Sequence, residues 1–299
     1  MPPLPNYPEF FTRRERALLG ARFEELLTPA LPIREAPARG VTVNTLRCAP
    51  EAFAAGMDIP LAPSPFCRQA FAAPADFRPG RHPWHHAGVF YAQEPSAAGA
   101  APLLDVRPGM RVCDLCAAPG GKSLTLAYAM GNAGALVSCD AVQSRLPLIE
   151  SAFRRCGVTC GRVLANDASC QNPALGQFDR ILCDVPCSGL GVIGKKPDVR
   201  YKTLEGLPEL AALQQRILRS AAASLAPGGR LVYSTCTLNP QENEDQIRAF
   251  CRDHPQFAVL PPASAPEGAA DTGFGTLLLP DRTGTDGFFA AILVRKPVK

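Results

Sequence analysis

Two patterns of hydrophobic and polar residues divide the chain near residue 98. From about Leu103 onward, short apolar runs bounded by Gly, Asp or Pro alternate with amphipathic stretches. The runs predict strands over Met110–Leu115, Ala135–Cys139, Arg162–Ala165, Arg180–Cys183, Arg230–Tyr233 and Phe288–Val294. The amphipathic stretches predict helices over Lys122–Met130, Val142–Cys156, Leu207–Leu225 and Gln241–Cys251. This alternation is typical of βαβ units, so we expect an α/β domain with a mostly parallel sheet over residues 99–299.

Residues 1–98 follow a different pattern. Apolar residues at helical spacing predict a helix from Thr12 to Leu27, which nearby prolines end. A β-like run, Val41–Leu46, and a Pro- and aromatic-rich tract follow. We therefore expect a small N-terminal α+β domain with a connector. Within the second domain, the Ala/Pro-rich segment Pro261–Ala270 predicts a loop.

Composition narrows the class of protein only slightly. The 299 residues are 46% hydrophobic and 19% charged, which argues against a chain that is disordered throughout. Lys and Arg number 31 against 27 Asp and Glu, a net charge of +4 that is compatible with a polyanionic partner without indicating a dedicated nucleic-acid module. The first residues lack the pattern of a secretory signal, and glycines interrupt the longest uncharged stretch, Ser123–Cys139. We expect a cytoplasmic protein without a membrane span.

Cysteine and histidine clusters could suggest a metal. The twelve cysteines are too dilute for a disulfide scaffold, so we expect free thiols. Cys113 and Cys116 form a C-x-x-C pair, but residues three apart in a strand point to opposite faces. Three histidines fall within His82–His86 without a cysteine or acidic partner at ligand spacing. We expect core cysteines, histidines that pack or contact a partner, and no metal.

The first expected strand of the second domain runs into a turn that suits a ligand. Small residues and two glycines let the backbone approach a bound molecule, and the helix that opens at Ser123 offers free N–H groups. A P-loop is the alternative, with Asp184 as a magnesium ligand, but Cys116 replaces its first glycine and Pro119 removes a donor. The residues of the turn are Cys116, Ala117, Ala118, Pro119, Gly120, Gly121 and Lys122.

An acidic residue, Asp140, closes the second expected strand twenty residues after Gly120. Dinucleotide-binding folds place an acid there to accept hydrogen bonds from ribose hydroxyls. The G-x-G-x-x-G fingerprint is absent. A glycine turn without a phosphate cradle, followed by such an acid, fits a nucleoside without phosphates, of which S-adenosylmethionine is one. An ordinary tight turn with a solvated Asp140 remains the alternative.

Two thiols, Cys187 and Cys236, lie just beyond the ends of the fourth and fifth expected strands. The carboxyl ends of parallel strands share one edge of a sheet, so both thiols are expected beside the ligand turn. Structural cysteines more often lie within a strand, as Cys183 does. A functional pair is the hypothesis that this position favours, and two unrelated structural cysteines are the alternative.

Three stretches together resemble a known family. They are Asp114–Lys122 (DLCAAPGGK), Asp184–Gly191 (DVPCSGLG) and Tyr233–Glu244 (YSTCTLNPQENE), which resemble the cofactor and two-cysteine motifs of the Nol1/Nop2/Sun RNA cytosine-5 methyltransferases. The segment His82–Ser96 also resembles the connector of this family. The resemblance runs from about Phe10 to Lys296. It implies a Rossmann-like enzyme that uses S-adenosylmethionine to methylate carbon 5 of a cytosine in RNA through a covalent Cys–cytosine intermediate.

The resemblance also implies roles for individual residues. Cys236 is the implied nucleophile, and Cys187 assists release. Asp184 borders the methionine amino group and the cytosine edge around N3, and Lys122 lies near the base. An anionic carboxylate cannot donate to N3, so this role predicts a protonated or proton-sharing Asp184. For the cofactor, the resemblance implies the glycine turn under the methionine portion, Asp140 on the ribose and Asp167 near the adenine.

The expected partner is RNA, gripped through its phosphates. Basic side chains that could contact phosphate, or form a solvated basic face instead, are Arg154, Arg155, Arg162, Lys195, Lys196, Arg200 and Lys202. The chain ends soon after its last expected strand, so target choice is expected to rest on residues 1–98, surface loops or an assembled ribosomal particle. We expect a monomer acting on small-subunit rRNA. The alternatives are a tRNA substrate, a catalytically silent ribosome-assembly factor and a P-loop ATPase.

Overall fold

Five parallel strands form one side of a nine-stranded sheet in the computed structural model, which describes residues 39–193, 195–196, 198–199, 202, 205–263 and 265–297. The helix predicted from Thr12 to Leu27 lies outside these residues. In the order β7-β6-β5-β8-β9, the strands are Gly161–Ala165, Ala135–Asp140, Arg111–Asp114, Phe178–Asp184 and Leu225–Thr235. The chain leaves β5 through β6 and β7 and returns on the other side at β8. Ligands of such sheets bind at the carboxyl ends of the strands beside this reversal.

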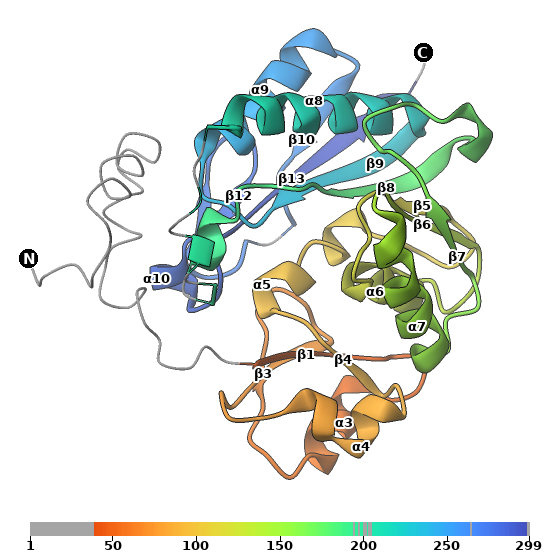
Figure 1. The fold of residues 1–299 in the computed structure, drawn as a ribbon, viewed down its shortest axis with the longest axis vertical. Coiled ribbons are helices and arrows are strands. Elements are labelled where there is room, and N and C mark those ends of the chain that lie inside the picture. The colour runs from red at the N-terminus through yellow and green to blue at the C-terminus, as the bar shows by residue number, and fades with distance from the viewer. Residues whose placement is uncertain are drawn as a thin grey trace, which may run out of the picture.

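Antiparallel strands extend the sheet beyond β9 (Figure 1). They are β10 (Phe257–Leu260), β11 (Ala269–Asp271), β12 (Thr276–Leu278) and β13 (Phe288–Arg295). The segment predicted as a loop over Pro261–Ala270 therefore ends in a strand, because Ala269 and Ala270 pair with β12. The expected α/β class with a mostly parallel sheet is confirmed, with an antiparallel edge added to its parallel strands.

Helices cover both faces of this sheet (Figure 1). The helices are α6 (Gly121–Ala129), α7 (Leu146–Cys156), α8 (Leu207–Ser224) and α9 (Glu244–Asp253). Consecutive strand residues point to opposite faces, so Leu182 and Val232 pack in the α6 and α7 cluster, whereas Cys183 and Tyr233 pack in the α8 and α9 cluster. Both layers bury continuous apolar cores.

Two of the predicted helices begin later than expected. After β6, Asp140 Oδ1 accepts a hydrogen bond from the Val142 N–H at 3.0 Å, and a 3₁₀ turn, η3 (Gln143–Arg145), precedes α7. Before α9, Asn243 has φ −114° and ψ −107°, which separates the 3₁₀ turn η7 (Pro240–Glu242) from the helix. In both places a 3₁₀ turn stands between the strand and the helix, which hydrophobic periodicity does not reveal.

A smaller antiparallel sheet precedes this domain in the described chain. In the order β2-β3-β1-β4, its strands are Ala62–Pro63, Ala70–Ala73, Arg39–Val43 and Phe90–Ala92, with α3 (Pro50–Gly56) packed against them. Phe53 of α3 lies 5.5 to 6.0 Å, ring centre to ring centre, from Phe71, Trp84 and Phe90. The remaining short helices and 3₁₀ turns are α4 (Pro83–His86), α5 (Pro95–Ala98), α10 (Pro280–Thr283), η1 (Pro79–Arg81), η2 (Pro102–Leu104), η4 (Pro173–Leu175) and η5 (Leu190–Val192).

Hydrogen bonds fix the small sheet to the large domain. The run predicted over Val41–Leu46 ends at Val43, because Asn44 turns the chain and its Oδ1 accepts from the Leu46 N–H. Its Nδ2 donates to the carbonyls of Gly88 and Cys156, both at 2.8 Å. Arg155 of α7 donates to the carbonyl of His85 at 2.5 Å. The small domain is therefore bonded directly to the end of α7.

Replacing Asn44 by Ala is expected to lower the free energy of unfolding by about 2 to 3 kcal/mol, because two buried carbonyls lose their donor. Urea unfolding of the two proteins measures the difference. Asn166→Ala, which removes a partly buried bond within one loop, is the matched control and is expected to cost less. Equal losses of unfolding free energy in the two variants would show that the Asn44 bonds stabilise the protein no more than a bond within one loop does.

Candidate active site

The carboxyl ends of β5, β8 and β9 meet at one cavity of about 360 Å³. Residues at these strand ends form one wall of the cavity: the glycine turn Cys116–Lys122, Asp184 and Cys236. The opposite wall comes from Tyr91–Ala97, which leads out of the small sheet, and from Asp286–Phe288 at the start of β13. The strand ends selected from the sequence thus lie together. Cys187, Asp140 and Asp167 are not among the lining residues.

The glycine turn brings the chain close to the connector. Gly120 has φ +111°, a conformation that favours glycine, and α6 begins at the next residue. A Cβ at Gly121 would lie 3.0 Å from the Tyr91 ring and 3.2 Å from the Gln93 amide carbon. The glycines therefore permit both the turn and the close contact that narrows the cavity.

Asp140 is buried at the end of β6 and bonds back to the glycine turn. Its Oδ2 accepts from the Ala118 N–H at 3.2 Å and lies 3.3 Å from the Arg145 guanidinium. Asp167 follows the neighbouring strand β7 and is exposed. Hydrogen bonds from the side chain and the N–H of Ser169 lower its pKa. The two acids lie after adjacent parallel strands, beside the cavity rather than in its wall.

Lys122 and Asp184 form an ion pair in the cavity wall. Lys122 Nζ lies 2.7 Å from Asp184 Oδ2, and the side chains are 15% and 26% exposed. Ser234 donates to the other oxygen, Oδ1, at 2.7 Å. Burial disfavours the charged ammonium, but the charge of Asp184 and its hydrogen bond outweigh this and raise the pKa of Lys122. Lys122 is therefore held as a charged hydrogen-bond donor at a fixed position.

The two thiols predicted at the strand ends are in contact. Cys187 Sγ and Cys236 Sγ lie 3.2 Å apart. The hydrogen bond from Cys187 lowers the pKa of Cys236, and it outweighs burial and the charge of Asp184, which act in the opposite direction; the charge of Lys122 adds to the lowering. The same hydrogen bond and burial raise the pKa of Cys187 well above its usual range. The pair therefore favours a thiolate on Cys236, with the remaining proton on Cys187.

Two acidic residues in the cavity wall were missed by the sequence analysis. Asp114 ends β5, and Asp286 lies just before β13 with 14% of its side chain exposed. Burial raises the pKa of each carboxyl to about 7, and the nearby Glu94 adds to the effect at Asp286. An acid at a strand end is a signal that was available for Asp114. The position of Asp286 depends on contacts between distant parts of the chain.

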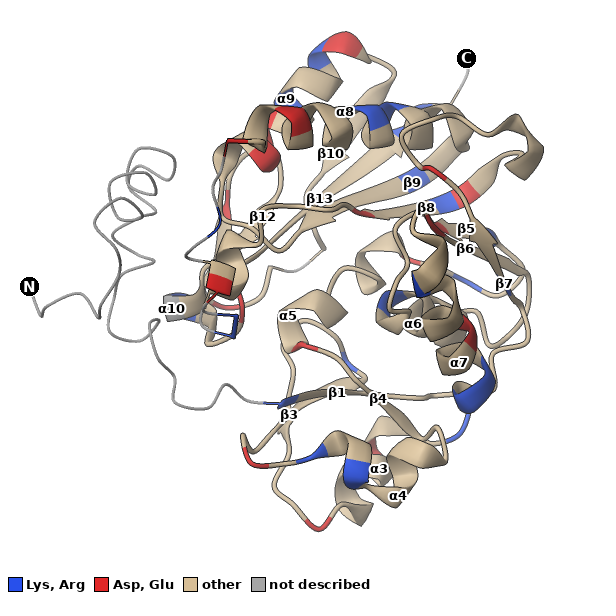
Figure 2. Ribbon diagram, in the orientation of Figure 1, with Lys and Arg blue, Asp and Glu red and all other residues tan. Residues whose placement is uncertain are grey.

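The basic side chains fall into different places. Lys195 and Lys196 line the cavity, Arg154 and Arg162 are exposed, and Arg200 lies outside the described residues. The guanidinium of Arg155 faces inward and bonds to carbonyls of the small domain. Figure 2 shows basic residues on both domains rather than on one continuous face.

The histidine segment contributes packing in this structure. His82 Nδ1 accepts from the Trp84 N–H at 3.1 Å, which caps α4, and its ring lies 5.6 Å from Trp84. Within the described ranges, no group of three or more His, Cys, Asp or Glu residues is arranged to hold a metal ion. In those same ranges, no helix is both long enough and apolar enough to cross a membrane.

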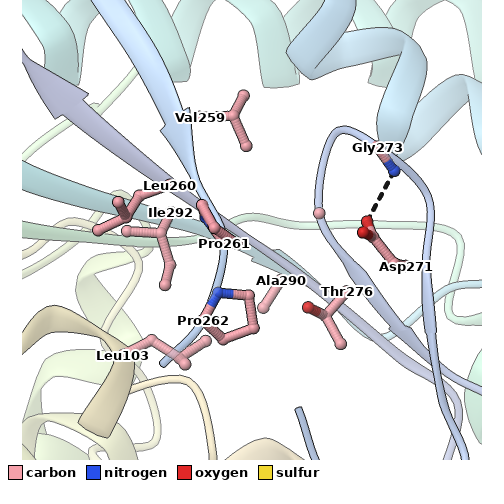
Figure 3. Close-up of a pocket in the computed structure, with 11 residues that line it drawn as sticks. Leu103, Val259, Leu260, Pro261, Pro262, Asp271, Gly273, Thr276, Ala290 and Ile292 are labelled. Carbon is pink, nitrogen blue, oxygen red and sulfur yellow. Dashed lines mark hydrogen bonds between the residues drawn. The ribbon is translucent and has the colours of Figure 1, made fainter. Parts of the chain in front are cut away.

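A second pocket lies away from the thiols, where the loop after β10 meets β12 and β13 (Figure 3). Its lining is mostly aliphatic and includes Leu103, Pro262 and Ile292. Asp271 is its one acidic lining residue, and its Oδ1 accepts from the Gly273 N–H at 2.8 Å. No cysteine or lysine is among its lining residues, whereas the first cavity is lined by Cys236 and Lys122.

A sheet that reverses at β5, a glycine turn on that strand and ligand-facing strand ends define the larger domain as Rossmann-like. Residues 101–294 match the family described as 16S rRNA methyltransferase RsmB/F. Residues 7–95 match the N-terminal domain of 16S rRNA methyltransferase RsmF. The chain belongs to the RsmB/F family, which confirms the predicted Nol1/Nop2/Sun membership and removes the P-loop alternative.

Individual relatives agree with this assignment. The chain is 34% identical over 307 residues to the ribosomal RNA small subunit methyltransferase F of Erwinia tasmaniensis, covering 96% of this chain and 63% of the relative. It is 40% identical over 222 residues to a probable ribosomal RNA small subunit methyltransferase B of Bacillus subtilis, covering 70% and 48%. The crystal structure of a methyltransferase homolog protein from Pyrococcus horikoshii has 29% identity and a TM-score of 0.83, covering 97% and 96%. The chain thus spans less than two thirds of these two curated relatives.

The raised pKa of Asp114 predicts a specific dependence of stability on pH. Between about pH 4 and 7, the folded protein keeps a proton on this buried carboxyl that the unfolded chain releases, so this group makes stability fall as pH rises. Asp114→Asn cannot ionise. Its stability relative to the wild type is expected to rise across this range, by up to about 1.4 kcal/mol per pH unit, and then to level off.

Urea unfolding between pH 4.5 and 8 measures this difference. Asp245→Asn, at an exposed carboxylate of α9, is the control and is expected to follow the wild type within a few tenths of a kcal/mol. Parallel stability curves for Asp114→Asn and wild type would contradict the raised pKa.

Proposed function

We propose that this protein acts as a monomer that methylates carbon 5 of a cytosine in small-subunit rRNA, using S-adenosylmethionine and a covalent Cys236–cytosine intermediate. The observation that carries the proposal is the contact between Cys187 and Cys236, 3.2 Å apart beside the cavity that holds Lys122 and Asp184. Carbon 5 of cytosine is a weak nucleophile. A thiolate that adds to carbon 6 breaks the ring conjugation and moves electron density onto carbon 5, which divides one difficult step into two easier ones.

The two thiols divide this work between them. Cys236, whose pKa is lowered by the hydrogen bond from its partner, is the thiolate that adds to carbon 6. Cys187 keeps its proton and donates to Cys236 until the substrate arrives. After the methyl group is transferred, a base must take the proton from carbon 5 so that its electron pair re-forms the ring double bond and expels Cys236 as a thiolate. Once Cys236 is bonded to carbon 6, its charge and its hydrogen bond no longer raise the pKa of Cys187. Cys187 can then lose its own proton to solvent and assist the release as this base.

Lys122 and Asp184 balance the charge that builds up on the ring. Both Asp184 oxygens accept hydrogen bonds, one from Lys122 and one from Ser234. Because both oxygens of Asp184 already accept, this carboxylate has no proton to donate to N3 of the cytosine. We therefore assign the proton that N3 requires to the Lys122–Asp184 pair, in which the ammonium is the donor.

The residues of this chain fit the cofactor. One oxygen of Asp114, Oδ1, is buried without a hydrogen-bond partner in the wall of the cavity, where it can accept from a cationic amino group. The glycine turn leaves room for the methionine portion, and Asp140 and Asp167 are proposed to contact the ribose and the adenine. When bound, S-adenosylmethionine supplies an electrophilic methyl group. The protein supplies orientation and excludes water.

Two observations support small-subunit rRNA as the proposed substrate: the description of the family and the basic residues that line the cavity. The family of residues 101–294 is described as acting on 16S rRNA. Lys195 and Lys196 line the cavity and are proposed to contact phosphate, while residues 1–98 form the other RNA-contacting surface and residues 99–299 the catalytic domain. The target base must be single-stranded or flipped out of its stack to reach Cys236.

Covalent trapping in bacterial cells tests the mechanism. Cys187→Ala is expected to accumulate a slow-migrating, RNase-sensitive protein–RNA adduct on denaturing gels, because the release residue is missing. Cys187/Cys236→Ala/Ala is expected to show none, because the nucleophile is missing as well. Sequencing of the trapped RNA identifies the substrate, and a tRNA would replace rRNA in the proposal.

Cys170→Ala, at an exposed cysteine away from the cavity, is the matched control and is expected to trap no RNA. Purified protein that binds S-adenosylmethionine in a thermal-shift assay but neither traps nor methylates rRNA or tRNA would point instead to a silent ribosome-assembly factor.

A further inference from the structure

The stretch Tyr233–Glu244 contains a carboxylate, Glu242, to which the proposed mechanism gives no role. The side chain of Glu242, in η7, is completely buried. Its Oε1 accepts from the Ser188 N–H at 2.8 Å and from Gln214 Nε2 at 3.0 Å, and its Oε2 accepts from Ser188 Oγ and from Asn239 Nδ2. No lysine or arginine in the described part of the chain forms an ion pair with it. Burying such a charge costs several kcal/mol unless hydrogen bonds compensate.

The partners of Glu242 belong to the two loops that carry the cysteines. Ser188 directly follows Cys187, and Asn239 lies three residues after Cys236. The two loops are also joined directly, because Ser188 Oγ lies 2.8 Å from Thr237 Oγ1. Gln214 of α8 donates to the carbonyl of Pro186 at 2.9 Å and so fixes the first loop from its other side. One buried carboxylate thus joins the residues that set the distance between the thiols.

The charge of Glu242 also distinguishes the two thiols. The hydrogen bond to Cys236 and burial are the largest causes that raise the pKa of Cys187, and the charge of Glu242 adds to them. At Cys236, the hydrogen bond from Cys187 is the largest cause and lowers the pKa; Lys122 acts in the same direction, whereas burial, Asp184 and Asp286 act against it. The hydrogen bond within the pair and the charge of Glu242 therefore both favour the proton on Cys187.

We propose that Glu242 is a positioning residue that holds the two cysteine loops in register and keeps the proton of the pair on Cys187, which leaves Cys236 as the thiolate. The inference rests on the proposed function, since it explains why one cysteine attacks and the other assists. The four donors around it match a carboxylate, because the amide of a glutamine has only one accepting oxygen. The same negative charge favours the proton on Cys187.

Site-resolved alkylation tests the inference without RNA or cofactor. The protein is treated with iodoacetamide at several pH values between 6 and 9, and peptide mass spectrometry gives separate rates at Cys187 and Cys236. In the wild type, Cys236 is expected to react faster. In Glu242→Gln, which removes the charge, the ratio of the Cys236 rate to the Cys187 rate is expected to fall about ten-fold.

Three further variants separate charge from structure. Glu242→Asp keeps the charge but withdraws it by one methylene, so it is expected to lower the ratio two- to three-fold, well short of the change in Glu242→Gln. Ser188→Ala keeps the charge but removes a hydroxyl link, so it is expected to lower the melting temperature while changing the ratio less than two-fold. Asp245→Asn, at an exposed carboxylate on α9, is expected to change neither.

The outcomes are distinct. A folded Glu242→Gln with the wild-type ratio, or equal ratios in Glu242→Gln and Glu242→Asp, overturns the inference. If Glu242→Gln does not fold, Glu242→Asp carries the test, because withdrawing the carboxylate by one methylene is expected to change the ratio at least two-fold. Failure of the covalent trap with a ratio that still depends on Glu242 overturns the proposed function alone.

Discussion

Parallel pairing of β8 with both β5 and β9 is the constraint on which the site depends. The register aligns Asp114 with Leu182 on one side of β8 and Asp184 with Ser234 on the other. Three loops therefore leave the sheet at the same level. The glycine turn, the Lys122–Asp184 ion pair and the two thiols lie close together because these strands end at the same edge of the sheet.

Much of this site could be predicted from the sequence, because strand ends carry local signals. Apolar runs that stop at Asp184 and before Cys236 placed both loops at one sheet edge, and the glycine turn marked the ligand side. The contact between the thiols and the bond from Lys122 to Asp184 join residues 49 and 62 positions apart. Such partners depend on register, which periodicity within single segments does not contain.

The acidic residues illustrate the same limit. Asp286 and Glu94 are 192 positions apart, yet the Asp286 N–H donates to the Glu94 carboxylate at 3.1 Å. Glu242 falls within a stretch that the sequence analysis did quote, but its burial among neutral donors follows only from the packing of α8 and both cysteine loops. Short-range patterns identify the elements, and long-range packing determines the electrostatics.

The bonds from Asn44 and Arg155 between the small sheet and α7 also affect how a substrate enters. One wall of the cavity belongs to the chain that leaves the small sheet, and the other belongs to the large domain. Since these parts are fastened together at α7, the entrance cannot widen by a hinge between them without breaking buried hydrogen bonds. Under the proposed function, the nucleic acid would therefore have to unstack the target base outside this rigid entrance, and the free energy of that unstacking would influence which cytosines can enter.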